Sequence, residues 1–388
     1  MDMKVNQKSF SRTISSDLNN SIKKNKKNNL DGMIKLKRFQ KLLQKKNIDL
    51  ALVLNLHNKD PNMFYFTGMK LDGSFLLIPK KGNLKLITNK MEFERAKKYS
   101  KIKDVKMYTK PAMEFLTKII NRFGNNLGIN KEVISLNEFK MLKKHFKKKK
   151  YIDISRLLLD NRKIKDEDEI DKIKIACKIT DEIFSKITKK FNFKTEKEIE
   201  DFMRAQATKN GCKMAFDPIV ASGMSSSMPH YRGQNVKLKK GFMVLDFGVE
   251  YKGYKSDMTR TIYLGNPTIK EIEHYNLLLV TQIKTIKKAK VGMKAKDLTQ
   301  FSINSLGKCG ENFIHGLGHG FGIEIHELPS LHIESKETLP ENTVFTIEPG
   351  IYFENKYGIR IEDDILLQKN KKTVLTKSNK ELIIIKKK

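Results

Sequence analysis

Apolar residues in the first part of the chain alternate between helical spacing and short continuous runs. Leu36, Phe39 and Leu43 recur every three or four positions, which predicts an amphipathic helix after residue 33. Apolar runs bounded by glycine and proline follow, and such runs are typical of strands. They are residues 50–54, 63–66 and 75–78. This alternation predicts an α/β domain over residues 33–157.

A second domain is predicted for residues 158–388. It opens with apolar residues at helical spacing over residues 166–188, where acidic residues in the first turn oppose the helix dipole. Thr195 and Glu198 have the spacing of a capping box, so a second helix should follow closely. From Gly241 onward the pattern changes to strands.

The first of two acidic hairpins carries Asp246 and Asp257. Two apolar strands flank a turn signal at residues 251–253. If the turn is centred near residues 251 and 252, the two carboxylates are opposed across the ladder. Their Cβ atoms would then lie about 5 Å apart, close enough to bind shared cations.

The second hairpin repeats this design with Glu348 and Glu362, which are opposed if the turn is centred near Asn355. Apolar residues precede Asp246 and Glu348, so both positions follow strands that are predicted to be buried. Four buried carboxylates cannot stay ionised side by side unless a cation lies among them. The two hairpins together therefore predict a two-metal site.

Three of the eight histidines lie within twelve residues of a glycine-rich stretch. They are His315, His319 and His326. Glycine lets the backbone approach a ligand closely, so the stretch indicates a binding site. His319 lies between the acid pairs in sequence and supplies a candidate nitrogen ligand. His230, in Met-Pro-His-Tyr-Arg, is a weaker candidate when taken alone.

Composition narrows the class of protein. A chain of 388 residues favours two domains, and 39% hydrophobic with 31% charged residues is typical of globular proteins. The sequence shows neither the apolar run of about 18 residues that a membrane span needs nor a secretory signal. The three cysteines are widely spaced, which fits a reducing compartment, so we expect a cytoplasmic protein.

The net charge of +33 is high enough to suit nucleic-acid binding, because clustered lysines release counterions from phosphates. Lysine is, however, spread through every region of the chain, with the densest runs at residues 143–150 and 386–388. We therefore expect a solvated basic surface and no nucleic-acid partner. Residues 1–32 are rich in Asn, Ser and Lys without an apolar period, and they predict a disordered basic tail.

The candidate ligands resemble those of the pita-bread metallopeptidases, the family of creatinase, prolidase and aminopeptidase P, and within it the Xaa-Pro peptidase branch. The resemblance extends from about residue 33 to the end of the chain. The family's ligand order of Asp, Asp, His, Glu, Glu is matched in full. The matching residues are Asp246, Asp257, His319, Glu348 and Glu362, with similar segments at 64–68, 229–230, 256–261, 348–350 and 358–363.

The resemblance implies an α+β protein, in which a C-terminal pita-bread catalytic domain follows an N-terminal creatinase-like α/β domain. It also implies two divalent metal ions, which activate a shared water and polarise the peptide carbonyl before proline. Ligands of oxygen and nitrogen without sulfur suit manganese best, then cobalt, and leave zinc or iron open.

The resemblance also implies roles for individual side chains. Glu348 would be a ligand that shuttles a proton to the departing nitrogen. His230 and His326 would hold the peptide carbonyl and stabilise the tetrahedral oxyanion. His315 and Arg360 would contact the substrate or support the ligands, and Arg360 has the alternative of pairing with a ligating carboxylate.

Two other functions stay open from the residues. One is a creatinase-like hydrolase that does not cleave peptides, and the other is a basic protein of this fold that binds nucleic acid or the ribosome. The complete ligand set argues against both. An Xaa-Pro peptide is the expected substrate, of a dipeptidase or an aminopeptidase, and the resemblance suggests a homodimer.

Overall fold

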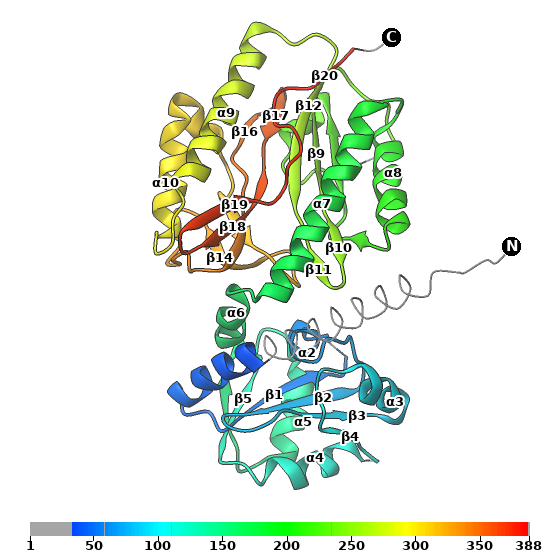
Figure 1. Cartoon of the computed structure of the whole chain (residues 1–388), viewed down its shortest axis with the longest axis vertical. Coiled ribbons are helices and arrows are strands. Elements are labelled where there is room, and N and C mark those ends of the chain that lie inside the picture. The colour runs from blue at the N-terminus through cyan, green and yellow to red at the C-terminus, as the bar shows by residue number, and fades with distance from the viewer. Residues whose placement is uncertain (1–32, 58, 110, 234, 387–388) are drawn as a thin grey trace, which may run out of the picture. The chain divides into compact units, whose positions relative to one another are not determined.

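The computed structural model describes residues 33–386 except residues 58, 110 and 234 (Figure 1). The chain divides into two compact units, Met1–Asn161 and Arg162–Lys388. The tail predicted at residues 1–32 lies outside the described residues. Among the described residues, no helix is both long enough and apolar enough to cross a membrane.

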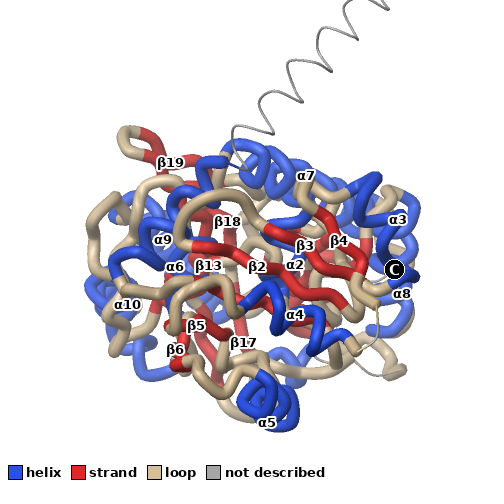
Figure 2. The backbone as a smooth tube through the Cα atoms, turned by 90° about the horizontal axis from the view of Figure 1, so that it is seen from below, coloured by secondary structure: helices blue, strands red, loops and turns tan. Residues whose placement is uncertain are grey.

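The first unit is built on a six-stranded mixed sheet in the order β4-β3-β2-β1-β5-β6. Antiparallel pairs join β1 to β2 and β2 to β3, and the remaining pairs are parallel. Figure 2 shows β2, β3 and β4 side by side. The strands are β1 (Leu50–Asn55), β2 (Ser74–Pro79), β3 (Lys85–Thr88), β4 (Val105–Met107), β5 (Asn126–Ile129) and β6 (Lys150–Asp153).

Helices complete the first unit, and one of them corrects a prediction. Residues 33–45 are helical, as the apolar spacing predicts. The apolar run at residues 63–66, expected to be a strand, is instead part of α2 (Pro61–Thr67). Asp60 caps this helix through the backbone N–H of Asn62, proline occupies its first turn, and Gly68 ends it at φ 75°. The other helices are α3 (Lys90–Tyr99), α4 (Ala112–Ile120), α5 (Leu136–His145) and α6 (Ser155–Lys163).

Four long helices flank the sheets of the second unit. Asp166 forms the capping box that starts α7 (Glu167–Lys189), and Thr195 caps α8 (Glu196–Lys209), close to the predicted positions. In Figure 1, α7 and α8 lie along one flank, and α9 (Ile269–Lys288) and α10 (Ala295–Ser305) lie along the other. Each helix pair covers its own buried apolar cluster.

Two larger sheets and two small ones carry the predicted ligands between these helices. One larger sheet has the order β20-β12-β9-β8 and the other β14-β13-β15-β18-β19, with small sheets β11-β10-β7 and β16-β17. The strands are β7 (Lys213–Met214), β8 (Ile219–Ser222), β9 (Gly241–Phe247), β10 (Val249–Tyr251), β11 (Tyr254–Lys255), β12 (Met258–Leu264), β13 (Gly318–Gly320), β14 (Glu327–Leu331), β15 (Thr343–Ile347), β16 (Gly350–Phe353), β17 (Tyr357–Arg360), β18 (Asp363–Gln368), β19 (Lys371–Val374) and β20 (Ile384–Ile385).

The register of the first acidic hairpin differs from the prediction. Its turn is Lys252-Gly253, with φ of 48° and 84°, so Tyr251 pairs with Tyr254. Positive φ at both turn residues suits the right-handed twist of the strands. Asp246 consequently lies opposite Thr259 instead of Asp257. The predicted pairing is wrong by two residues. Because side chains alternate with a period of two, Asp257 still lies on the same face as Asp246, as its diagonal neighbour.

The second hairpin has the predicted register. Phe353 pairs with Tyr357 around Asn355, whose φ is 55°. Ile347 pairs with Asp363 beyond the hairpin in the same register. Glu348 and Glu362 are therefore opposite each other in this register, at a point where the two segments do not form ladder hydrogen bonds. The backbone N–H of Glu348 donates instead to Leu317 O, and that of Glu362 donates to Thr259 O. Strands from both larger sheets therefore converge at this interruption.

Candidate metal centre

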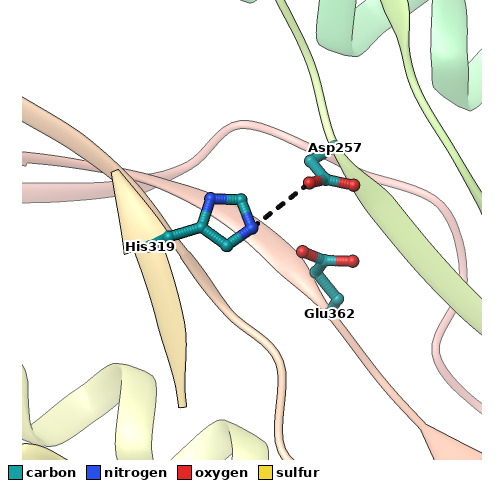
Figure 3. A group of neighbouring side chains, drawn as sticks. All are labelled: Asp257, His319 and Glu362. Atoms are coloured by element: carbon teal, nitrogen blue, oxygen red, sulfur yellow. Dashed lines mark ion pairs between the residues drawn. The ribbon is translucent and has the colours of Figure 1, made fainter. Parts of the chain in front are cut away.

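Three predicted ligands from three segments face one another at the convergence of the strands. Asp257, His319 and Glu362 each offer an atom within 4.8 Å of the other two (Figure 3). His319 Nε2 lies 3.6 Å from Asp257 Oδ2 and 3.4 Å from Glu348 Oε1. The structure thus brings Glu348 to the same nitrogen.

Asp246, the remaining predicted ligand, lies on β9 beside this group. Arg360 Nη2 donates to its Oδ2 atom over 2.7 Å. The other oxygen, Oδ1, is buried without a hydrogen-bond partner among the described residues, and the same holds for Glu362 Oε1. Leaving such an atom unpaired is costly, so these two oxygens fit ligands of a cation.

His319 is oriented by its own strand. Its Nδ1 atom lies 3.2 Å from Gly320 O, and because a carbonyl only accepts, Nδ1 carries the proton. The lone pair of Nε2 consequently faces the carboxylates, as in metal-binding histidines whose other nitrogen donates. Burial lowers the pKa of His319, which keeps the ring neutral near pH 7. Its contacts with Asp257 and Glu348 are therefore not ion pairs, and a cation between these atoms would satisfy them.

The glycines around His319 are explained by crowding of the backbone. A Cβ atom on Gly318 would lie 2.2 Å from Thr346 O, and one on Gly320 would lie 2.1 Å from Leu328 O. Both distances are far inside van der Waals contact. The close approach also lets the N–H of His319 donate to Thr346 Oγ1, which in turn donates to Glu348 Oε1, both over 3.0 Å. Glycine thus fits β13 between its neighbours and links two candidate ligands.

The buried carboxylates have raised pKa values. Burial, then the charges of Glu362 and Asp246, raise the pKa of Asp257 well above its ordinary value. Burial and the charges of Glu348 and Asp246 do the same for Glu362. Burial raises the pKa of Glu348 to about 7, although Arg360 opposes the shift. Like charges in a dry site cause such shifts, and a bound metal ion would reverse them.

Arg360 holds several parts of the site together. Besides Asp246, it donates to the hydroxyl of Tyr352 over 2.7 Å and to Thr259 Oγ1 over 3.0 Å. Its pKa is raised well above the ordinary value, although burial opposes this. The structure therefore pairs Arg360 with a predicted ligand, which is the alternative that the sequence left open.

His315 reaches the same network through Tyr352. Its Nδ1 atom lies 2.7 Å from Gly316 O, and its Nε2 atom lies 3.0 Å from the Tyr352 hydroxyl. Burial and then Arg360 lower the pKa of His315 to about 4, so the ring is neutral. Since both nitrogens are engaged, His315 orients Tyr352.

His326 and His230 lie at the exposed side of the site. The ring centroids of His326 and His319 are 4.4 Å apart in an edge-to-face arrangement. Burial, His319 and His230 lower the pKa of His326, in that order. Arg360 Nη1 lies 3.4 Å from Pro229 O, which places the turn before His230 beside the ligands. His326 thus packs against a candidate ligand, and His230 lies near enough for its charge to act on Glu348.

A buried glutamate anchors the turn that carries His230. Glu196 accepts from the backbone N–H and the hydroxyl of Ser222, both over 2.8 Å, and from the hydroxyl of Tyr231 over 2.9 Å. These contacts fix both ends of the segment, one on each side of His230 in sequence.

Several supporting residues were not predicted from the sequence. Thr259 donates to Glu362 Oε2 over 2.7 Å, and this contact depends on the hairpin register. Tyr352 bridges Arg360 and His315 from the second hairpin. The predicted hairpin register could have identified Tyr352. In that register Arg360 pairs with Gly350, and Tyr352 lies two residues further along the same strand, on the same face.

Comparison with known families agrees with this architecture. Residues 171–369 match Metallopeptidase family M24, and residues 35–164 match the Creatinase/Prolidase N-terminal domain. The fold and the candidate centre thus define a two-domain metallopeptidase, and the predicted α+β pita-bread architecture is confirmed. The chain belongs to metallopeptidase family M24.

Individual relatives cover nearly the whole chain. An Xaa-Pro dipeptidase from Pyrococcus horikoshii is 36% identical over 90% of this chain and 98% of its own length. The structure of an Xaa-Pro dipeptidase from Bacillus anthracis matches with a TM-score of 0.85 and 32% identity, over 92% of this chain and all of that one. An X-Pro aminopeptidase from Thermotoga maritima matches with a TM-score of 0.81 and 32% identity, over 87% and 98%.

Proposed function

We propose that this protein is a metal-dependent Xaa-Pro peptidase, which cleaves the peptide bond before proline. The observation that carries the proposal is the convergence of Asp257, His319 and Glu362, with two buried carboxylate oxygens left without a protein donor among the described residues. Support for the substrate class comes from similarity to proteins named Xaa-Pro dipeptidase. The relatives include both dipeptidases and an aminopeptidase, so both specificities remain candidates.

The proposed ligands are the five predicted residues Asp246, Asp257, His319, Glu348 and Glu362. Their oxygen and nitrogen donors suit two divalent ions, with manganese the leading choice and cobalt, zinc and iron as alternatives. When bound, such ions supply an activated water and polarise the scissile carbonyl. The protein's part is to hold each donor in place, through Thr346, Thr259 and Arg360.

Glu348 is the proposed proton carrier. Its carboxylate lies 3.4 Å from His319 Nε2, within the candidate centre, where it could take up a proton and release it to the departing nitrogen. Thr346 Oγ1 orients one of its oxygens. His230 and His326 are proposed to donate to the peptide carbonyl as negative charge develops there. His315 and Arg360 are proposed to support the site from the side of Asp246.

The test is hydrolysis of Gly-Pro and Met-Pro dipeptides against Xaa-Pro-Xaa tripeptides, after loading with manganese and after removal of metal by a chelator. We expect turnover that depends on metal, and preference for either length separates dipeptidase from aminopeptidase. Asp171→Asn serves as control, because Asp171 is a largely exposed acid on α7. Absence of turnover on every such peptide with any divalent metal would overturn the proposal in favour of the creatinase-like alternative.

Other expectations accompany the proposal. The three cysteines are free, which supports a cytoplasmic location. A homodimer and the absence of a nucleic-acid partner stay predictions, which light scattering and RNA binding at several salt concentrations test. The domain limits 33–157 and 158–388 also stay predictions.

A further inference from the structure

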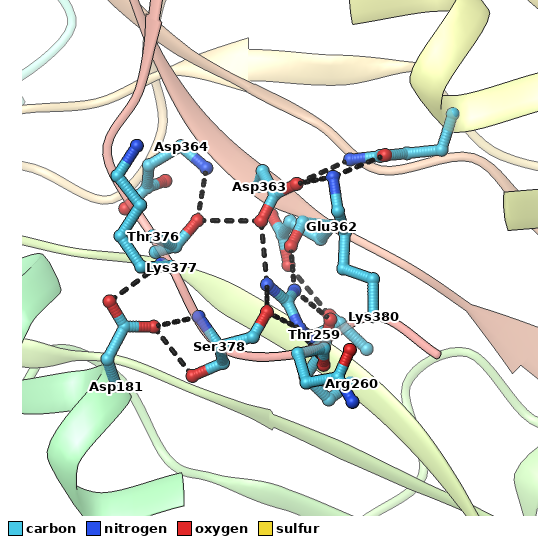
Figure 4. Close-up of polar contacts among 12 residues, drawn as sticks. Asp181, Thr259, Arg260, Glu362, Asp363, Asp364, Thr376, Lys377, Ser378 and Lys380 are labelled. Carbon is cyan, nitrogen blue, oxygen red and sulfur yellow. Dashed lines mark hydrogen bonds and ion pairs between the residues drawn. The ribbon is translucent and has the colours of Figure 1, made fainter. Parts of the chain in front are cut away.

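A short segment near the C-terminus, Thr376–Lys380, lies outside the helices and strands yet makes many buried polar contacts (Figure 4). We call it the C-terminal clasp. Asp181 on α7 fixes its middle, because its carboxylate accepts from the backbone N–H of Lys377 and from the N–H and hydroxyl of Ser378, at 2.6–2.7 Å. The clasp therefore has a defined conformation set by α7.

Arg260 connects the C-terminal clasp to both strands that carry candidate ligands. The side chain is 1% exposed, and it donates to the carbonyl of Ser378 over 3.0 Å. It also donates to the carbonyls of Thr259, over 3.0 Å, and of Glu362. One guanidinium thus donates to the backbone of the candidate ligand Glu362, of its own strand β12 and of the clasp. Its planar set of donors suits such a bridge.

Asp363, the residue after Glu362, is the second connection. It is fully buried, and Arg260 Nη2 and Thr376 Oγ1 donate to its Oδ1 atom over 2.7 and 2.9 Å. Lys380 Nζ and Gln282 Nε2 donate to Oδ2 over 2.7 and 2.8 Å. Two donors of the carboxylate, Thr376 and Lys380, belong to the clasp.

Asp364 connects the clasp with the other ligand strand. Its Oδ2 atom accepts from the backbone N–H of Asp257 over 3.0 Å and from Cys177 Sγ over 3.2 Å. Its own N–H donates to Thr376 Oγ1 over 3.1 Å. Thr376 thereby contacts both acids that follow Glu362. Asp364 thus holds the backbone at Asp257, and Arg260 holds the backbone at Glu362.

From these contacts we propose that the C-terminal clasp positions the metal ligands, with Lys380 and Asp181 as positioning residues outside the site itself. The proposal rests on the proposed metal centre and adds a residue set to it. Clasp contacts fix the spacing between the Asp257 and Glu362 backbones, and a cation bound by both side chains depends on that spacing. Loosening the clasp should therefore weaken metal binding beyond its effect on folding.

The test is the affinity of metal-free protein for manganese, followed by the electron paramagnetic resonance signal of free Mn²⁺. Lys380→Met removes one donor to Asp363 and leaves Arg260 in place, so the protein should still fold. We expect about a tenfold loss of manganese affinity, as for other residues that orient ligands. Asp181→Ala, which frees the clasp from α7 without touching Asp363, should lower the affinity in the same direction. Lys380→Arg should restore most of it.

The matched control is Lys163→Met. Lys163 pairs with Glu337 over 2.8 Å and is 15% exposed, against 23% for Lys380, and neither residue of this pair is one of the five proposed ligands or adjacent to one in sequence. The control should lower the melting temperature of the metal-free protein while leaving manganese affinity within about twofold. If Lys380→Met and Asp181→Ala lower only the melting temperature, as the control does, the clasp proposal is overturned.

The measurement separates this proposal from the proposed function. Wild-type protein that binds manganese but cleaves no Xaa-Pro peptide would overturn the function and leave the clasp proposal standing. Wild-type protein that binds no divalent metal would overturn the metal centre and the clasp proposal with it. Normal hydrolysis together with unchanged affinity in both clasp variants would overturn the clasp proposal alone.

Discussion

Glu362 and Asp363 are adjacent and buried, yet they lie in opposite electrostatic environments. Burial and neighbouring carboxylates raise the pKa of Glu362 well above its ordinary value. Burial also acts to raise the pKa of Asp363, but the charges of Arg260 and Lys380 outweigh it, so that pKa is lowered. The two side chains thus meet different charges: carboxylates surround Glu362, whereas Arg260 and Lys380 lie beside Asp363.

This difference in pKa separates buried acids that are neutralised by the protein's own Arg and Lys side chains from buried acids that are not. Glu327, like Asp363, is buried with two cations, Arg162 and Lys165, and its pKa is lowered although burial opposes this. In the candidate metal centre, Arg360 hydrogen bonds to Asp246, and His319 is neutral. If all the acids of the centre are ionised, their negative charge exceeds what these neighbours balance, as expected of a site for divalent ions.

The largest expected effect is loss of activity when the cluster loses a ligand. Asp257→Asn should reduce Xaa-Pro hydrolysis below detection, because one donor that faces His319 is replaced by an amide. Manganese affinity should fall by at least about 100-fold, the upper range for residues that only orient ligands. Peptide assays and metal titration measure both. Activity near the wild-type level would show that Asp257 is not a ligand.

The second effect compares the two neighbours directly. In metal-free protein, Asp363→Asn should lower the free energy of unfolding by roughly 3–5 kcal/mol, because Arg260 loses its buried partner. Glu362→Gln should leave that free energy unchanged or raise it, because it removes a repelled charge. Urea unfolding in the presence of a chelator measures both. Equal losses in the two variants would contradict the electrostatic difference between these positions.

The third effect is a dependence on pH that metal reverses. The folded pKa of Glu348 is about 7, against an ordinary value of 4.5, so the folded metal-free protein binds more protons than the unfolded chain between these values. Its contribution to stability is present below pH 4.5 and is lost as pH rises through 7.

We therefore expect metal-free protein to lose roughly 2 kcal/mol between pH 5 and pH 8. Glu348→Gln should reduce this loss. Metal affinity should rise over the same range, because ligands bind metal when deprotonated. Unfolding curves at several pH values, with chelator and with manganese, provide the measurement. A metal-free protein that gains stability over this range would contradict the raised pKa of Glu348.

The smallest expected effect on stability and activity comes from Glu196. Its carboxylate accepts hydrogen bonds from neutral donors on Ser222 and Tyr231. Glu196→Gln removes no ion pair among these contacts, so it should cost only about 1 kcal/mol of stability. Because the segment carries His230, KM for Xaa-Pro peptides should rise a few-fold while manganese affinity stays constant. Steady-state kinetics and metal titration separate the two, and a fall in metal affinity would contradict this assignment.

Sequence patterns predicted the parts of the fold that depend on local spacing. The helix after Asp166 and the turn at Asn355 lie where the residues place them, because capping and turn chemistry act over a few positions. The strand expected at residues 63–66 was wrong, since Asp60, Pro61 and Gly68 favour a helix there more strongly than the apolar run favours a strand.

Contacts over long sequence distances could not be predicted in this way. Asp246 lies opposite Thr259 because both central residues of the turn have positive φ, and a turn signal alone does not fix the register. The bond from Cys177 to Asp364 joins residues 187 positions apart, which no spacing rule relates. The candidate ligands could be identified from their residue types and their order along the chain. The residues that hydrogen bond to them could not, because those contacts depend on tertiary packing.

The matched positions of Glu348 and Glu362 also restrict which insertions and deletions the second hairpin can accept. The two acids flank the hairpin β16–β17 at matched positions, in the same register as the pairs on either side. An insertion in one arm alone would shift that register, and a single residue would turn a carboxylate to the opposite face. Homologues that keep both acids should therefore gain or lose residues in equal numbers on the two arms, or within the turn.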